Sequence, residues 1–123
     1  PDELASHQLL IYTLAHQPNL LRFTRNGAVT AVPVHGLLEA NDGQVLRAAA
    51  LKHHGILIQP MYIIHDDVVA GRLVPMLKEW ELARLTINIA YPTRRHLPAK
   101  VRCFVDFLVE KFAENDFERR WTA

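Results

Sequence analysis

The feature that most constrains the fold is one continuous stretch, NDGQVLRAAALKHHGI, from Asn41 to Ile56. It begins with turn-forming residues, continues as an alanine-rich run with helical spacing, and ends in two histidines and a glycine. Asn41 and Gln44 match a capping box, and Gly55 suits the left-handed residue that ends a helix. The stretch therefore predicts a helix over residues 41–54, with short apolar segments before and after it that are typical of strands.

Apolar periodicity and turn residues predict the remaining elements. The expected strands cover residues 8–14, 21–24, 28–38, 56–58 and 85–91, and the further helices cover residues 63–70, stopped by Gly71, and a segment that starts near Pro98. Asn26-Gly27 predicts a tight hairpin turn, with Phe23 and Val29 as candidates to pair across it. Strands and helices in this order predict an α/β domain with layers on both faces of a sheet.

Charge and cysteine content exclude several classes of protein. The chain has 14 Lys and Arg against 13 Asp and Glu, whereas a domain that grips a phosphate backbone usually carries a clear basic excess. We interpret Arg94-Arg95-His96 as a solvated turn. The single cysteine, Cys103, cannot form an internal disulfide and is expected to pack within the last helix. Apolar runs are too short to cross a membrane, and we expect a cytoplasmic location.

Catalytic and metal-binding patterns are absent from the sequence. His53 and His54 are adjacent, so on a helix they point about 100° apart and do not suit one ion. The spacings HExxH and CxxC do not occur, and neither do a GxSxG elbow or a glycine-rich phosphate loop. We interpret His65-Asp66-Asp67 as the start of a helix, where the dipole alone explains carboxylates. We expect no catalytic residue, no metal and no cofactor, and we expect the chain not to be an enzyme.

Two binding functions compete for the helix at residues 41–54. Its sequence is similar to the first helix of a helix-turn-helix, but a recognition helix should then follow closely. Ile56 to Pro60 is strand-like instead, so we reject DNA reading. The alternative is a small ligand at the turn Asn41-Asp42-Gly43, where free N–H groups of the helix start form an anion site at the end of a strand. The same residues are also explained without a ligand: Asn41 would only cap the helix, and Asp42 would only complement the helix dipole.

Three blocks of sequence are similar to one known family. They are ANDGQVLRAAALKHHGILIQP (Ala40 to Pro60), GRLVPML (Gly71 to Leu77) and YPTRRHLPAKVRCFVDFLVEKF (Tyr91 to Phe112). In this order and spacing they resemble the effector-binding domain of LysR-type transcriptional regulators. The resemblance implies an α/β fold like that of type II periplasmic binding proteins. Residues 1–84 would form the second lobe, a three-layer αβα unit, and residues 85–123 the crossover strand and C-terminal helix of the first lobe.

The same resemblance implies binding residues and partners. A small-molecule effector, which the sequence does not identify, would bind in the cleft between the lobes. The residues expected to face it are Tyr12, Thr13, Asn41, Asp42, Gly43, Pro60 and Met61. The family also forms homodimers or tetramers, and the helix face expected in such an interface carries Val45, Ala48, Ala49 and Lys52.

The DNA-binding part of the family is expected to lie outside this chain. The chain starts without a methionine and lacks a winged helix-turn-helix, so we expect a fragment that meets DNA only through an absent N-terminal domain. No membrane partner is expected. A solute-binding protein or an enzyme on the same fold remains the alternative.

Overall fold

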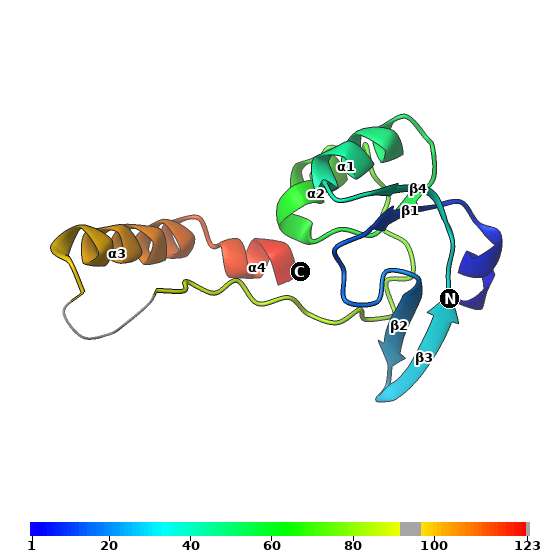
Figure 1. The fold of residues 1–123 in the computed structure, drawn as a ribbon, viewed down its shortest axis with the longest axis horizontal. Coiled ribbons are helices and arrows are strands. Elements are labelled where there is room, and N and C mark those ends of the chain that lie inside the picture. Colours follow the sequence, from blue (N-terminus) through cyan, green and yellow to red (C-terminus); the bar gives the residue numbers. More distant parts are fainter. Residues whose placement is uncertain (92–96, 123) are drawn as a thin grey trace. The chain divides into compact units, whose positions relative to one another are not determined.

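The structure is a computed structural model that describes residues 1–91 and 97–122. It divides into two compact units, Pro1–Arg84 and Leu85–Ala123 (Figure 1). The division falls between residues 84 and 85, and the assignment of the two units to lobes of a larger domain stays a prediction. The basic cluster Arg94-Arg95-His96 lies outside the described residues.

A three-stranded parallel sheet lies at the centre of the first unit. Its order is β4 (Gly36–Ala40), β1 (Leu9–Tyr12), β5 (Ile56–Leu57), and β1 pairs with both neighbours in parallel. Because β1 is central, both of its faces are covered, and Leu9, Leu10 and Ile11 are all buried. This explains why residues 8–14 form a continuous apolar run instead of alternating with polar residues. The predicted α/β class is confirmed.

The two faces of this sheet are covered by different structures. On one face Leu10 packs with Leu46 and Ala50 of α1 (Gly43–Leu51), and α2 (Met61–Val69) lies beside α1. The other face is covered by the hairpin of β2 (Leu20–Arg25) and β3 (Ala28–Pro33) and by the short 3-10 helix η1 (Asp2–Ser6). The expectation of a second helical layer was therefore wrong for the described part of this unit: the hairpin buries the apolar side chains there.

The hairpin has the predicted turn, but its register differs by one residue. Asn26 and Gly27 both have positive φ, at 51° and 80°. Phe23 pairs with Thr30, and Val29 pairs with Thr24. Phe23 is buried in the core, whereas Val29 is 61% exposed. Val29 is opposite Thr24, the neighbour of Phe23, and neighbouring residues of a strand face opposite sides of the sheet. The single strand predicted over residues 28–38 is in fact β3 and β4.

Both ends of α1 differ in detail from the prediction. The N-cap is Asp42, whose Oδ1 accepts the Gln44 N–H at 2.8 Å, so the helix begins two residues later than expected and Asn41 does not cap it. At the other end His54 N–H donates to Ala49 O, and His53, with φ 64°, is the left-handed residue. Gly55 is thus not the helix stop; it lies against Gln8, the residue before β1, and the next residue, Ile56, donates its N–H to Gln8 O at 2.8 Å.

The second unit confirms the last helix and corrects the strand before it. Helix α3 covers Ala99–Glu114 and begins directly after Pro98. Residues 85–91 are extended, but no strand in the described part of the chain pairs with them, so they do not form the predicted β-strand. An open apolar groove of about 480 Å³ is lined by Ile87, Asn88, Ile89, Leu108, Val109 and Phe112.

A short helix that the periodicity did not predict follows α3. Helix α4 (Phe117–Thr122) stacks Phe117 on Trp121 at 4.4 Å between ring centroids, and both rings meet Phe112 edge-on.

Cys103 is exposed on α3, so it does not pack as expected within the described residues.

Candidate functional site

The carboxyl ends of the three parallel strands meet at one edge of the sheet. Tyr12 at the end of β1 is opposite Ala40 at the end of β4, and Thr13 N–H donates to Ala40 O at 2.9 Å. Asn41, Asp42 and Gly43 follow β4, and Pro60 and Met61 follow β5. The fold therefore brings all seven residues predicted to face an effector to the edge where α/β sheets usually bind ligands.

The start of α1 lies very close to the segment that follows β5. A Cβ atom placed on Gly43 would lie 2.8 Å from Gln59 Oε1 and 2.9 Å from Ile63 Cδ1, so only glycine fits here without movement of these side chains. Gln59 is therefore part of this edge, although the sequence did not single it out. Its place immediately before Pro60 was the available signal.

The residues of this edge differ in how far they reach solvent. Thr13, Asn41 and Asp42 are exposed, whereas Gly43, Pro60 and Met61 are half-buried. Tyr12 is also half-buried and packs against the Leu10, Leu46 and Ala50 cluster. The exposed polar groups come from the ends of β1 and β4, and the apolar ones come mainly from the start of α2.

The electrostatics at the start of α1 argue against the predicted anion site there. Asp42 already places its own carboxylate on the Gln44 N–H, so an incoming anion would meet a negative charge and an occupied donor. By contrast, α2 follows Pro60 without a side-chain cap. The uncapped helix start at this edge therefore belongs to α2.

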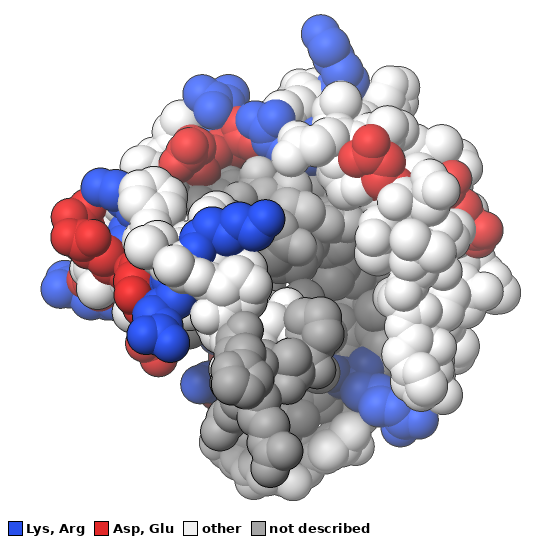
Figure 2. Space-filling model, turned by 60° about the vertical axis from the view of Figure 1, so that its left-hand side comes forward, with Lys and Arg blue, Asp and Glu red and all other residues white. Residues whose placement is uncertain are grey.

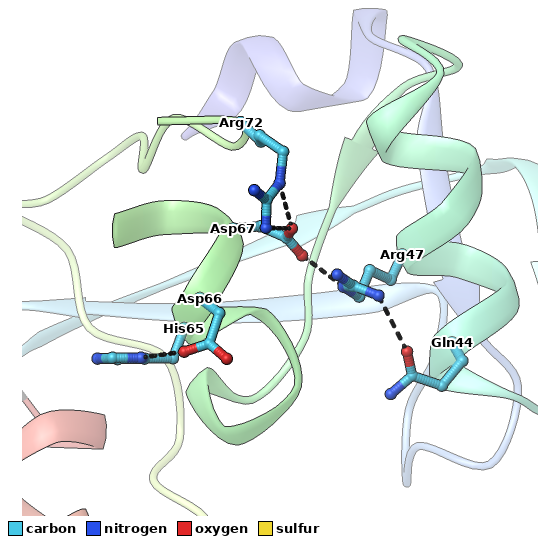
Figure 3. Close-up of polar contacts among 6 residues, drawn as sticks. All are labelled: Gln44, Arg47, His65, Asp66, Asp67 and Arg72. Carbon is cyan, nitrogen blue, oxygen red and sulfur yellow. Dashed lines mark hydrogen bonds and ion pairs between the residues drawn. The ribbon is translucent and has the colours of Figure 1, made fainter. Parts of the chain in front are cut away.

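A buried carboxylate joins the two helices behind the edge. Asp67 on α2 is 1% exposed and accepts hydrogen bonds from Arg47 Nε on α1 and, at 2.8 Å, from Arg72 Nε (Figure 3). The hydrogen bond from Arg47 is the main cause that holds the pKa of Asp67 below its ordinary value, with help from Arg72 and against the opposing effect of burial. The same pairing raises the pKa of Arg47.

The interpretation of His65-Asp66-Asp67 as a helix start was wrong. Because α2 begins at Met61, these residues lie in its second half. Asp66 is exposed and lies 3.0 Å from the His65 Nδ1 atom, whereas Asp67 faces the interior. The signal was available: counted from Met61, Asp67 falls four residues after Ile63, on the apolar face. An acidic residue there requires a cationic partner.

Three further observations bear on other functions. Within residues 1–91 and 97–122, no group of three or more His, Cys, Asp or Glu side chains could hold a metal ion. None of the helices described is long and apolar enough to span a bilayer. On the face drawn in Figure 2, basic and acidic side chains of the described residues are interspersed, without a broad basic surface.

Comparison with known families decides the relationship. Residues 1–113 match the family described as the LysR substrate binding domain. The chain belongs to this family. The predicted resemblance is thus confirmed over residues 1–113 of the 123-residue chain.

Individual relatives of this LysR domain are transcription regulators. The HTH-type transcriptional repressor PA14_22550 of Pseudomonas aeruginosa is 35% identical over 63% of the chain and 25% of the relative. For the regulator PtxR of P. aeruginosa the identity is 28% over 95% of the chain and 38% of the relative. The chain therefore spans only about a quarter to two-fifths of these relatives. They favour a regulator over the alternative of a solute-binding protein or an enzyme.

Solved structures agree with this LysR fold. The regulatory domain of AphB from Vibrio vulnificus has a TM-score of 0.65 at 26% identity, covering 89% of the chain and 56% of that domain. Full-length AphB from Vibrio cholerae has a TM-score of 0.68 at 27% identity, covering 90% of the chain and 39% of that protein. The expected fold, like that of type II periplasmic binding proteins, is confirmed.

The residues predicted for a dimer interface divide into two groups in this LysR domain. Val45, Ala48 and Lys52 are exposed on α1, and Val45 is 50% exposed. Ala49 is half-buried and packs against the core beside Leu46, so it offers less surface to a partner. Strand β4, at the edge of the sheet, adds exposed Leu37 and Leu38.

Proposed function

We propose that this chain is the effector-sensing part of a LysR-type transcription regulator, and that it takes a small molecule at the carboxyl edge of the β4-β1-β5 sheet. The observation that carries the proposal is the convergence of Thr13, Asn41–Gly43 and Pro60-Met61 at that edge. In the full-length protein, DNA would be bound by a separate domain, as the names of the relatives suggest. A cytoplasmic location, where the DNA lies, follows from that proposal.

The turn after β4 offers a test in which binding and stability separate. Asp42 caps α1, so Asp42→Ala should lower the free energy of unfolding by about 1 kcal/mol. Asn41 is exposed and does not cap, so Asn41→Ala should leave stability within about 0.5 kcal/mol of the parent. We expect Asn41→Ala nevertheless to weaken effector binding by about five- to tenfold, because a polar contact in a binding site is worth about 1–1.5 kcal/mol.

The measurement is a thermal-shift screen of small metabolites against the parent chain, followed by the two variants. A compound that binds only the folded state, at a hundred times its Kd, should stabilise the parent by about 2.7 kcal/mol. Asn41→Ala should reduce that gain while its melting temperature without the compound stays unchanged. A hit that stabilises the parent and Asn41→Ala equally would place the effector elsewhere.

We also propose that the chain self-associates through α1 and the free edge of β4. Exposed Val45 and Ala48 lie on the helix that follows edge strand β4, where Leu37 and Leu38 are exposed as well, and dimer contacts commonly cover exposed apolar side chains. Val45→Glu should shift a dimer toward the monomer in light scattering, because a charge would be buried in the interface. Val74→Glu, at another exposed valine of the same unit, is the control and should leave the mass unchanged. A parent that is monomeric at high concentration would refute the proposal.

A further inference from the structure

Asp67 is bound by arginines from two different parts of the first unit. Arg47 comes from α1, and Arg72 comes from the segment after α2, with Arg72 Nη2 2.7 Å from Asp67 Oδ1. A buried ion pair contributes little stability compared with apolar side chains of the same volume, and such pairs are best attested where they fix geometry.

The arginine from α1 connects the carboxylate with the turn that follows β4. Arg47 Nη1 donates to Gln44 Oε1 at 3.4 Å (Figure 3). The Gln44 N–H in turn donates to Asp42 Oδ1 at 2.8 Å. Asp67 itself belongs to the helix that begins at Met61. The contacts Asp42–Gln44–Arg47–Asp67 thus join the start of α1 to the second half of α2, the two helices that begin at the proposed effector edge.

The arginine from the following segment acts on a different region. Arg72 and Leu73 also donate their backbone N–H groups to Asp67 O, at 2.8 and 3.2 Å, so the Arg72 side chain supports a turn that the backbone already holds. The Arg72 contact ends at this turn, whereas the Arg47 contacts continue through Gln44 to Asp42. Gly43 lies between these two residues, and its close approach to Gln59 leaves no room for a Cβ atom.

We propose that Asp67 is a positioning residue of the effector edge: through Arg47 it ties α1 to α2 and so holds the start of α1 against Gln59 and Ile63. The purpose of this arrangement rests on the proposed function, but the arrangement itself is tested without any effector. It can therefore fail while effector binding at the edge is found, and it can hold while the edge binds nothing.

The test compares Arg47→Leu with Arg72→Leu in the 123-residue chain. Each variant removes one arginine from the same carboxylate, so both should lower stability. The readouts are the amide signals of Gly43 and Gln44 and the ¹³C-labelled methyl signal of Met61, recorded by NMR under conditions in which both variants are folded. Met76 is the only other methionine. We expect Arg47→Leu to shift all three signals of the edge and to make amide exchange of Gln44 about tenfold faster, because the helix start is no longer held.

Arg72→Leu should leave the three signals of the edge near their positions in the parent, even though it destabilises the chain. If Arg47→Leu does not fold, Arg47→Lys replaces it and should shift the same signals in the same direction by a smaller amount, because lysine retains the charge but not the fork of donors. Equal shifts in the Arg47 and Arg72 variants, or no shift in either, would overturn the proposal and leave Asp67 with a purely structural role.

Discussion

Asp67→Asn should lower the free energy of unfolding by about 2–3 kcal/mol at pH 7. The change keeps the shape of the side chain, but it removes the charge that both Arg47 and Arg72 contact in a buried position. The two arginines are partly exposed, with side-chain exposures of 31% and 55%, so water can solvate them in the variant. For that reason the expected loss is smaller than for a cluster buried on all sides. Urea denaturation of parent and variant measures it.

The matched control is the neighbouring carboxylate. Asp66 lies on the same helix, but its side chain is 86% exposed, so Asp66→Asn should change stability by no more than about 0.5 kcal/mol. Equal losses in the two variants would show that neither the burial of Asp67 nor its contacts with the two arginines determine how much it contributes to stability.

The dependence on pH follows from the direction of the shift. The folded state lowers the pKa of Asp67, chiefly through the hydrogen bond from Arg47, so the unfolded chain takes up a proton first as the pH falls. The stability that Asp67 contributes is thus fully present above its unfolded pKa, about 3.9. It is lost as the pH falls from there through the lower folded value. The difference between parent and Asp67→Asn should shrink over that acidic range and stay constant between pH 5 and 7.

Gly55→Ala should cost about 2–3 kcal/mol, a loss comparable to that of the Asp67 variant. A Cβ atom at Gly55 would lie 2.6 Å from the backbone oxygen of Gln8, which is too close for either group to stay in place. The same oxygen accepts the Ile56 N–H, the contact that starts the pairing of β5 with β1. An added methyl group therefore disturbs the central sheet itself.

Gly55 also has a positive φ, at 156°, so its substitution adds backbone strain to the clash; Gly71→Ala is the comparison with backbone strain and no clash. Gly71 has φ 71°, but a Cβ atom there would meet nothing within 4 Å, so the variant should lose only about 1 kcal/mol. Thermal or urea denaturation of both variants measures the difference. A Gly55→Ala chain as stable as Gly71→Ala would mean that β1 and β5 are less closely paired than the structure shows.

Local patterns predicted the elements that local interactions determine. Helix α1, the turn at Asn26-Gly27 and helix α3 all follow from spacing and turn residues over a few positions. The sequence analysis predicted Asn41 as the cap of α1, whereas the structure has Asp42. Either side chain can accept an N–H of the first helical turn, so the sequence alone does not distinguish them. Only the course of the backbone after β4 decides between them.

The errors concern interactions between distant parts of the chain. Residues 85–91 have the composition of a strand, but a strand requires a partner edge, and the described residues provide none. Asp67 was read as a response to the helix dipole because its partners, Arg47 and Arg72, lie 20 and 5 residues away. The candidate site came from family resemblance, and the parallel pairing of β1, β4 and β5 explains why those residues lie together.

The most direct test of the proposed effector site is to map a bound metabolite by amide NMR. A compound found in the thermal-shift screen is titrated into the ¹⁵N-labelled chain, and the shifts are assigned. The effector site proposed here predicts the largest changes at Thr13, at Asn41 to Gly43 and at Met61, with small changes in residues 97–122. Changes centred on the groove of Ile87, Leu108 and Phe112, with the edge of the sheet unaffected, would contradict it.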